Sequence, residues 1–414
     1  MSDQSLVPLR VACVPRDDVL QGGLADNHFA AQLDKVVRDA EHYPVYGDAE
    51  AFFAQTYPTS GLKTLLTKTF GRVTGAKGVA GENGVLRPTT SFGGGKTHGL
   101  TAVYHLAGGA RPTNIADFID PALFADGSIQ VAALVGDALD PTAGVETEGH
   151  RTYTLWGEMA AQIGDAAYDA MAANDAQRTA PGTGTIKAAF GGNPTIVIVD
   201  EIAKYLRAVS SSGSEDVRRM ARAIPVFLGN LFEVASDPTN KVSVIITLAS
   251  TTNAFGAETT EISDLTGDEK QRADTANAAS VKAAEETGDV LTRAVQPSAV
   301  IRPADDNEIG AILKKRIFES VDESAAKAAG DAYRGLYESL GKTEQLAGGA
   351  EHPATYGELV TTTYPFHPEL VRVLDKRLGN ITQFQRARGA LKLLAEVVAH
   401  IYDTNDDTTI INVG

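Results

Sequence analysis

The fold of this chain is indicated most clearly by one segment, Ser91-Phe92-Gly93-Gly94-Gly95-Lys96-Thr97-His98. Three successive glycines let backbone N–H groups turn inward and approach an anion closely. The lysine would reach the β and γ phosphates of a nucleotide, and the threonine hydroxyl would bind Mg²⁺. The usual pattern has a glycine where this chain has Thr90, so the loop opens with a different turn. The segment predicts a phosphate-binding loop.

The segment after this loop predicts a helix clearly, whereas the segment before it predicts a strand only poorly. From Lys96 to Leu106 apolar side chains recur at helical spacing, and two glycines follow as a stop signal. A helix that begins at a glycine loop directs the positive end of its dipole at an anion. Residues 85–88 make a short, poor strand before the loop, because proline cannot donate to a central ladder. The alternative interpretation is a glycine-rich surface loop.

A second segment, Pro194-Thr195-Ile196-Val197-Ile198-Val199-Asp200-Glu201, is a β-branched run that ends in two carboxylates. Such runs form strands of parallel sheets that are buried on both faces. Ligands of open α/β sheets bind at the carboxyl ends of the strands, where these carboxylates would project. Asp200 would hold Mg²⁺, largely through water, and Glu201 would deprotonate the water that attacks the γ-phosphate. The alternative is a strand that ends in a solvated acidic turn.

A third segment predicts a parallel neighbour for this strand. Residues 215–231 form a helix with an N-cap at Ser214, and residues 242–250 form a buried strand after it. A hydroxyl at the end of that strand, from Thr247, Ser250 or Thr251, would lie between Glu201 and the γ-phosphate. Each of these hydroxyls is about as well explained by a bond to the local backbone.

The remaining sequence suggests how the chain is divided. We expect an N-terminal helical element and connector over residues 1–80 and a nucleotide-binding core over 81–300. Residues 179–193 read as a flexible stretch. Residues 256–289 read as a polar insertion without an apolar stripe, either a solvated helix or a mobile segment. An all-helical lid is expected over 301–402, and residues 403–414 read as the start of a further segment that is missing.

Composition excludes several classes of protein. The net charge is −16, with 53 acidic and 37 basic residues, so the overall field repels nucleic acid. One cysteine rules out a disulfide framework and a Cys-rich zinc site, and the scattered histidines give no transition-metal pattern. No apolar run is long enough to span a membrane, and the N-terminus lacks a secretory signal. The expected location is the cytoplasm.

Five segments of the chain carry a resemblance to a known family. They are Phe52-Phe53-Ala54-Gln55-Thr56-Tyr57-Pro58-Thr59 with Gly61-Leu62-Lys63, the glycine loop with Tyr104-His105-Leu106, Leu155-Trp156-Gly157-Glu158, Tyr364-Pro365-Phe366-His367-Pro368-Glu369-Leu370 and Phe384-Gln385-Arg386-Ala387-Arg388-Gly389-Ala390-Leu391. In these segments the chain resembles the large AAA+ ATPases, long known only as domains of unknown function, that occur with adenine-specific DNA methyltransferases in bacterial restriction and phage-defence loci. The resemblance covers almost the whole chain. The last two segments are the most specific.

This resemblance implies a P-loop, AAA+-like α/β fold in which a parallel sheet flanked by helices is followed by the helical lid. It implies ATP and Mg²⁺ as ligands, Lys96 and Thr97 as the Walker A pair, and Asp200 and Glu201 as the Walker B pair. The other nucleotide-binding candidates are Ser91, Phe92, Gly93, Gly94, Gly95, His98 and Ser250.

The resemblance also implies arginines near the γ-phosphate. Arg386 and Arg388 both lie in the lid, about 200° apart around a helix, so they cannot both face one nucleotide. We favour Arg388, because Gly389 and Ala390 beside it permit close approach. Arg293 lies where an arginine finger would be offered to a neighbouring subunit, and a surface arginine explains it equally well.

The expected function is Mg²⁺-dependent ATP hydrolysis that drives conformational change in an anti-phage defence complex. The expected partners are further copies of the chain and a DNA methyltransferase or nuclease, and direct contact with DNA is left open. The second hypothesis is a nucleotide-dependent switch or scaffold that binds ATP or ADP without appreciable turnover. A DNA translocase ranks last, because of the charge of −16.

Overall fold

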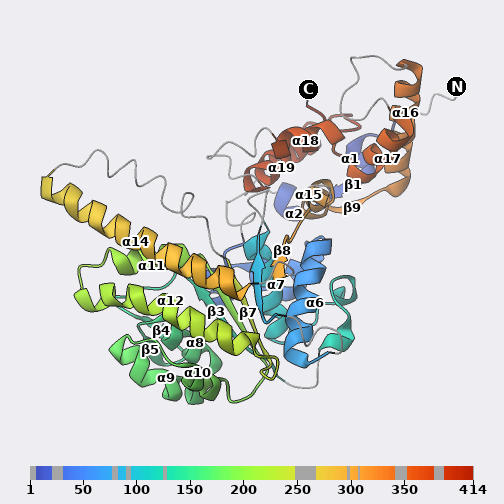
Figure 1. Ribbon diagram of the computed structural model, residues 1–414. Coiled ribbons are helices and arrows are strands. Elements are labelled where there is room, and N and C mark those ends of the chain that lie inside the picture. The colour runs from blue at the N-terminus through green and yellow to red at the C-terminus, as the bar shows by residue number, and fades with distance from the viewer. Residues whose placement is uncertain are drawn as a thin grey trace.

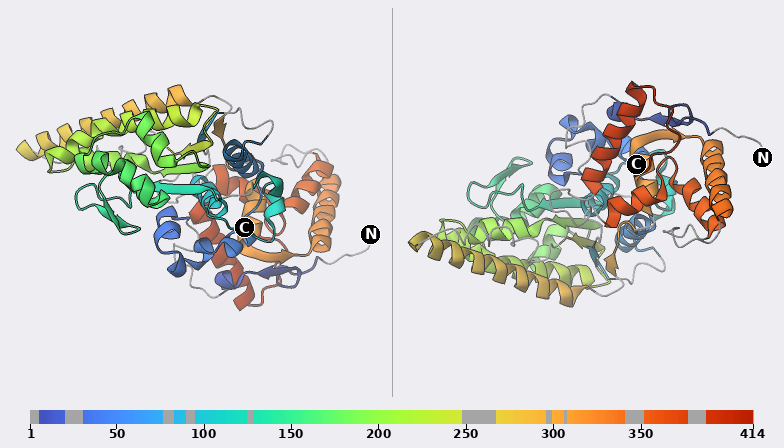
Figure 2. Two further views of the ribbon diagram at one scale, coloured as in Figure 1. Left: turned by 90° about the horizontal axis from the view of Figure 1, so that it is seen from below. Right: turned by 90° about the horizontal axis from the view of Figure 1, so that it is seen from above.

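The computed structural model describes residues 6–20, 31–76, 83–89, 95–124, 128–247, 267–295, 299–305, 308–340, 352–376 and 387–413. A five-stranded parallel sheet of order β3-β6-β7-β2-β8 forms its centre, with helices on both sides (Figures 1 and 2). The strands are β2 (Val85–Pro88), β3 (Gln130–Val135), β6 (Thr195–Asp200), β7 (Val242–Ile246) and β8 (Val300–Ile301).

Side chains of the central strands alternate between the two faces of the sheet. Along β6, Val197 and Val199 belong to one hydrophobic cluster, whereas Ile196 and Ile198 belong to another. This alternation follows from the two-residue period of a strand. An unbroken apolar run is therefore needed wherever both faces are covered, which is why the sequence of β6 predicts this strand so clearly.

Two sets of helices cover the two faces. The face of Val197 is covered by α8 (Leu155–Ile163), α9 (Asp165–Gln177), α10 (Thr183–Phe190), α11 (Ile202–Ser210), α12 (Glu215–Ser236) and α14 (Gly267–Ala294). The face of Ile196 is covered by α3 (Leu33–Arg38), α4 (Pro44–Gly47), α5 (Ala49–Ala54), α6 (Ser60–Thr74) and α7 (Lys96–Ala107).

The proline in β2 is accommodated by a change of partner strand. Val85 and Leu86 pair with β7, whereas Arg87 and Pro88 pair with β8. Thr89 donates its backbone N–H to Ile301 O of β8 at 2.7 Å. Since successive N–H groups of a strand point to opposite sides, the missing N–H of Pro88 faces β7 beyond the last paired residue. The β2–β7 pairing therefore ends at Leu86, before the proline.

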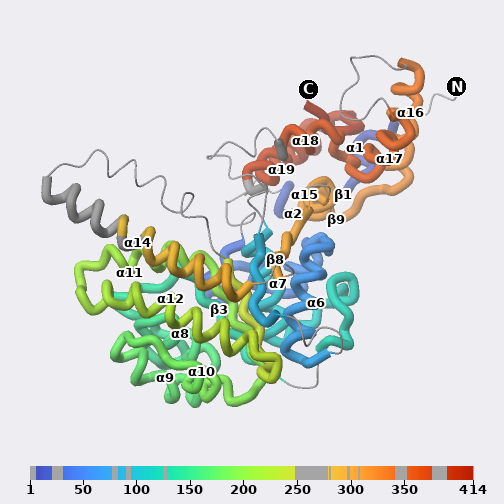
Figure 3. Tube along the Cα trace, viewed as in Figure 1, coloured from blue at the N-terminus to red at the C-terminus, as the bar shows by residue number. Residues whose placement is uncertain are grey.

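The C-terminal helices form a separate hydrophobic cluster that includes residues of the segment 9–19. In Figure 1 the blue elements α1, β1 and α2 lie among the orange and red helices, and the Cα trace in Figure 3 shows the same arrangement. β1 pairs antiparallel with β9. The elements are α1 (Leu9–Ala12), β1 (Cys13–Pro15), α2 (Asp17–Leu20), α15 (Ile309–Ile317), β9 (Phe318–Val321), α16 (Glu323–Leu340), α17 (Pro353–Thr363), α18 (Pro368–Lys376) and α19 (Ala387–Asp403).

This arrangement changes several expectations from the sequence. Residues 9–19 pack with the C-terminal helices and 33–73 pack on the sheet, so the segment 1–80 is divided between two cores. The C-terminal unit is not all helical, because β9 lies within it, and β8 joins the central sheet. The stretch 179–193 contains helix α10, whose Ile186 and Phe190 are buried.

The polar insertion is helical where it is described, as one of the two alternatives expected, but one face of the helix is buried. Residues 267–294 form α14, whose Ala283, Ala284 and Leu291 are buried in the cluster that contains α11 and α12. These apolar residues lie in the C-terminal part of the segment. The acidic and alanine-rich composition of the whole segment therefore did not predict this buried face. The strand predicted over 242–250 ends at Ile246 as β7.

Candidate functional site

The glycine loop leads directly into the N-terminus of α7. Gly95 is the N-cap residue and has a φ of 95°, in the left-handed region that favours glycine. Lys96 and Thr97 form the first turn of α7. Ser91, Phe92, Gly93 and Gly94 lie outside the described residues. The described part of the loop therefore has the strand, glycine and helix order of an anion-binding helix N-terminus.

Thr97 lies next to Asp200. The Thr97 hydroxyl donates to Asp200 Oδ2 at 3.0 Å, although the two residues are 103 positions apart. Thr247 Oγ1 donates to Asp200 Oδ1, and the backbone N–H of Glu201 donates to the same oxygen at 3.1 Å. The structure thus brings together the end of β6, the start of α7 and the residue that follows β7.

Asp200 is a buried carboxylate with an unusual environment. Only 3 % of its surface is exposed, and among the described residues no cationic side chain forms an ion pair with it. Its partners are neutral hydroxyl and amide groups. Since a buried charge normally has a counter-ion or coordinates a metal, the arrangement is suited to a cation beside Asp200. Hydroxyl and carboxylate oxygens are ligands that Mg²⁺ accepts.

The topology of the sheet explains why these residues meet. The helix after β2 covers one face of the sheet, whereas the helices after β6 and β7 cover the other. Between neighbouring strands whose following helices diverge, the carboxyl edge of a parallel sheet opens into a crevice that binds ligands. Here that position lies between β2 and β7. It is bordered by the loop of Gly95, by Thr247 and by Asp200.

Glu201 begins α11 with a left-handed backbone, at a φ of 52°. Its carbonyl lies against Gly136, where a Cβ atom would be 2.3 Å from Glu201 O. The Glu201 carboxylate forms an ion pair with Lys204, and Lys204 Nζ is also 2.9 Å from Asp137 Oδ2. The candidate base is therefore held by a lysine of its own helix and, through it, by the loop after β3.

The contacts of the His98 side chain with other protein groups indicate a structural role. The Thr56 hydroxyl donates to Phe52 O at 2.7 Å and so accepts a hydrogen bond from His98 Nε2–H at 2.9 Å. The His98 ring lies 4.5 Å from the Phe52 ring. Burial, together with Coulomb repulsion from Arg316 and His105, lowers the pKa of His98 to about 4. His98 is neutral at pH 7, and its side chain is turned toward α5.

The predicted arginines and the predicted strand-tip serine are only partly described. Ser250 and Arg386 lie outside the described residues, as does the side chain of Arg388, whose backbone is in the first turn of α19. Arg293 is in the last turn of α14, and its side chain is exposed. Of the strand-tip hydroxyls weighed from the sequence, Thr247 is the one described, and it contacts Asp200.

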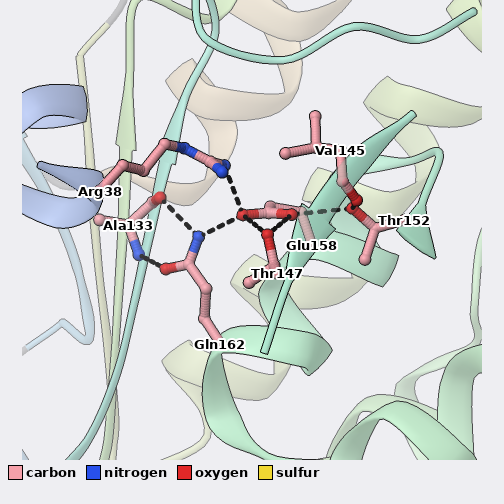
Figure 4. A network of polar contacts seen from close by, with 7 residues as sticks. All are labelled: Arg38, Ala133, Val145, Thr147, Thr152, Glu158 and Gln162. Atoms are coloured by element: carbon pink, nitrogen blue, oxygen red, sulfur yellow. Dashed lines mark hydrogen bonds and ion pairs between the residues drawn. The ribbon is translucent and has the colours of Figure 1, made fainter. Parts of the chain in front are cut away.

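The Leu155–Glu158 segment forms a buried polar network away from these residues (Figure 4). Glu158, 1 % exposed, accepts hydrogen bonds from Arg38, Gln162 and two threonines of the hairpin β4 (Val145–Thr147) and β5 (His150–Thr152). At Gly157 a Cβ atom would lie 2.2 Å from Asp175 Oδ1. The segment anchors the hairpin and α9 to the core, which is a structural role.

Sequence reasoning missed two residues of the site. Asp137 lies two residues after the end of β3, so its position at the carboxyl edge is a signal similar to that of Asp200, the last residue of β6. Lys204 lies three residues after Glu201 on α11, the spacing at which side chains of a helix meet. Lys204 was overlooked because α11 itself was not predicted.

Two negative results apply to the described part of the chain. None of its helices is both long and apolar enough to cross a membrane. In the same residues, no three His, Cys, Asp or Glu side chains are grouped so as to hold a metal ion.

Comparison with protein families gives two matches. The model of the DUF499 N-terminal domain matches residues 9–265, more than half of the chain. The model of the DUF499 second domain matches residues 304–412. No curated protein and no solved structure gives a significant match. The second match begins shortly before α15, and residues 266–303, which include α14, lie between the two matches.

Proposed function

We propose that this chain, which belongs to the DUF499 family, is an AAA+-type P-loop protein that binds ATP with Mg²⁺ and hydrolyses it. One observation carries the proposal: the hydrogen bond from Thr97 Oγ1 to Asp200 Oδ2 at 3.0 Å. It joins the hydroxyl at the end of the glycine loop to the acid at the end of a buried parallel strand. These are the two protein groups that hold Mg²⁺ in phosphate-loop enzymes.

The sheet supports the same proposal. Its strands are parallel, and the loop, Asp200 and Thr247 meet at the carboxyl edge beside the opening between β2 and β7. That edge is where open α/β sheets bind nucleotides. The N-terminus of α7 contributes backbone N–H groups and the positive end of its dipole for the phosphates.

Each residue has a chemical role in this proposal. Lys96 binds the β and γ phosphates and neutralises charge that develops during transfer. Thr97 and Asp200 hold Mg²⁺, which, when bound, withdraws negative charge from the phosphate oxygens. Glu201 accepts the proton of the attacking water. Thr247 orients the Asp200 carboxylate through its hydrogen bond to Oδ1.

In this proposal the C-terminal unit is the lid domain. Arg388 in the first turn of α19 is the favoured arginine for the γ-phosphate, with Arg386 as the alternative. The exposed Arg293 suits a finger offered to a neighbouring copy of the chain. We extend the proposal to a homo-oligomer that changes conformation within an anti-phage defence complex, with a DNA methyltransferase or nuclease as partner.

A titration of the full chain with ATP tests the binding step. We expect ATP to bind in MgCl₂ and Lys96→Ala to bind at least about tenfold more weakly, since a hydrogen bond to a charged group contributes about 1.5–3 kcal/mol. Arg87→Ala, on β2 before the loop, is the control and should bind as the wild type does. Equal binding by the wild type and Lys96→Ala contradicts the proposal.

One observation favours the second function, a switch that binds nucleotide without appreciable turnover. The Glu201 carboxylate forms an ion pair with Lys204, which it must release before it can act as a base. Light scattering in ATP, ADP or no nucleotide, combined with a phosphate-release assay, separates the two functions. A nucleotide-dependent change in size without released phosphate identifies the switch.

A further inference from the structure

The segment from Phe52 to Gly61 lies between the nucleotide site and the C-terminal unit. It comprises the end of α5, a turn and the start of α6. It overlaps one of the segments that carry the resemblance, and the proposed chemistry gives it no role. We call residues 52–61 the bridging segment.

The bridging segment contacts α7 one residue after the Lys96-Thr97 pair. Thr56, 3 % exposed, accepts from His98 Nε2–H at 2.9 Å and donates to Phe52 O at 2.7 Å. The Phe52 ring packs on the His98 ring at 4.5 Å. Because the position of His98 on α7 is fixed relative to Thr97, a movement of the first turn of α7 must be transmitted to Thr56.

The neighbouring residue of the bridging segment contacts the C-terminal unit. Gln55 Oε1 accepts a hydrogen bond from Arg316 of α15, and Arg316 Nη1 also donates to Asp18 Oδ2 at 3.2 Å. Arg316 is 5 % exposed. Arg16 adds a second connection, since it donates to Ala54 O at 3.2 Å and to Lys315 O at 3.1 Å. Positions 55 and 56 therefore face two different structural units.

The end of the bridging segment contacts the residues that precede α15. Thr59 Oγ1 donates to Pro303 O, and the Ser60 N–H donates to Glu308 Oε1 at 2.8 Å. A Cβ atom at Gly61 would lie 1.6 Å from Arg302 O. A Cβ atom at Gly95, in the glycine loop, would lie 3.8 Å from the Pro303 side chain. Pro303 thus borders both the bridging segment and the loop.

We infer that the bridging segment couples nucleotide binding to the position of the C-terminal unit, with Thr56 and Gln55 as positioning residues. The path runs from His98 through Thr56 and Gln55 to Arg316 and Asp18. The inference rests on the proposed function, since it needs a nucleotide at the loop. Coupling is reciprocal, so breaking the path must change both the response of the C-terminal unit and the affinity for nucleotide.

The test uses the full chain with spin labels on the exposed positions Glu233→Cys and Glu338→Cys, because the native Cys13 is buried. The distance between labels is measured without nucleotide, with MgADP and with magnesium adenylyl imidodiphosphate. We expect the distance to change with nucleotide in the wild type. In Thr56→Val the change is lost, and MgADP binds about fivefold more weakly or worse.

Thr69→Val is the matched control. Thr69 is also buried and also donates to the carbonyl four residues before it, Leu65 O at 2.7 Å, but it has no contact with His98. Thr69→Val and the conservative Thr56→Ser should both respond as the wild type does. Gln55→Leu, which removes the contact with Arg316 and leaves His98 untouched, should lose the response and provides a second test if Thr56→Val does not fold.

Each result distinguishes the inference from the proposed function. A wild-type response in both Thr56→Val and Gln55→Leu overturns the inference, and so does a loss of response in Thr69→Val. If the wild-type chain binds nucleotide without any change in distance, the inference is wrong and the proposed function stands. If the wild-type chain binds no nucleotide, the proposed function is wrong and the inference falls with it.

Discussion

Thr97 and Asp200 are joined by a hydrogen bond of 3.0 Å across 103 residues of sequence, at the carboxyl edge of a parallel sheet. If the pair holds Mg²⁺, Asp200→Asn keeps a side-chain oxygen but loses the charge that the cation requires. We expect the affinity for ATP in MgCl₂ to fall about tenfold or more and the affinity in EDTA to be unchanged, as measured by calorimetry.

The control for this prediction is Asp237→Asn. Asp237 forms an ion pair with Lys187 and precedes β7, at the opposite edge of the sheet. Its replacement should leave ATP binding unchanged in both buffers. Equal losses with and without MgCl₂ in Asp200→Asn would show that Asp200 acts on folding or on the loop and not on a cation.

The pairing of Glu201 with Lys204 predicts a variant with raised turnover. A carboxylate that is bonded to an ammonium group must release it before it can accept a proton from water. Both side chains are about half exposed, and exposed ion pairs contribute at most about 1 kcal/mol. Lys204→Met should therefore raise ATP turnover by up to about fivefold. Lys187→Met, which breaks an ion pair of similar exposure, should leave turnover unchanged, and a fall in Lys204→Met would mean that the lysine assists catalysis.

The close packing at Gly157 predicts a loss of stability without a direct effect on the site. A Cβ atom there would lie 2.2 Å from Asp175 Oδ1, so Gly157→Ala must displace a buried carboxylate that is bonded to Thr154 and Tyr153. We expect a loss of about 1–3 kcal/mol, seen as a lower midpoint of thermal unfolding. Gly184→Ala, at an open position of α10, should be neutral or slightly stabilising. Similar midpoints for the two variants would contradict this packing.

Buried histidines predict how stability depends on pH. Burial lowers the pKa of His105, although the hydrogen bond to Tyr46 O opposes part of this effect. The unfolded chain, with a histidine pKa of about 6.5, binds the proton more readily than the folded chain does. The contribution of neutral His105 to the free energy of unfolding is therefore complete above that pH and is lost as the pH falls below it.

Thermal unfolding at pH 7.5 and 5.5 checks this sign. The midpoint of the wild-type chain should be lower at pH 5.5, and the decrease should be smaller in His105→Gln. His352→Gln, at an exposed position, should show the full wild-type decrease. An equal decrease in all three chains would assign the pH dependence to other groups.

The sequence was sufficient to predict those elements whose signal is local. The β-branched run of β6 and the glycine-to-helix junction at Gly95 each carry their own pattern. The N-cap predicted at Ser214 is also present, since its hydroxyl accepts from the N–H of Val217. Such features depend on neighbours within a few residues, which a sequence displays directly.

The elements that the sequence did not reveal depend on distant partners. Cys13–Pro15 becomes a strand only because it pairs with β9, about 300 residues later, and Val300–Ile301 becomes one only beside β2. The ammonium partner of Glu201 was likewise hidden, because it depends on a helix that was not predicted. Thr247 lies beside Asp200 because β7 is the neighbour of β6 in the sheet, and its residue type alone does not predict this contact.

The most direct test of the central claim is steady-state phosphate release by the full chain in MgCl₂ and ATP. The account predicts release by the wild type and its abolition in Lys96→Ala and Glu201→Gln, with Glu201→Gln still binding ATP. Loss of a general base costs about 10²–10⁴-fold in rate, well outside the error of the assay. Release that survives in both variants would contradict the claim that this edge of the sheet is an ATPase site.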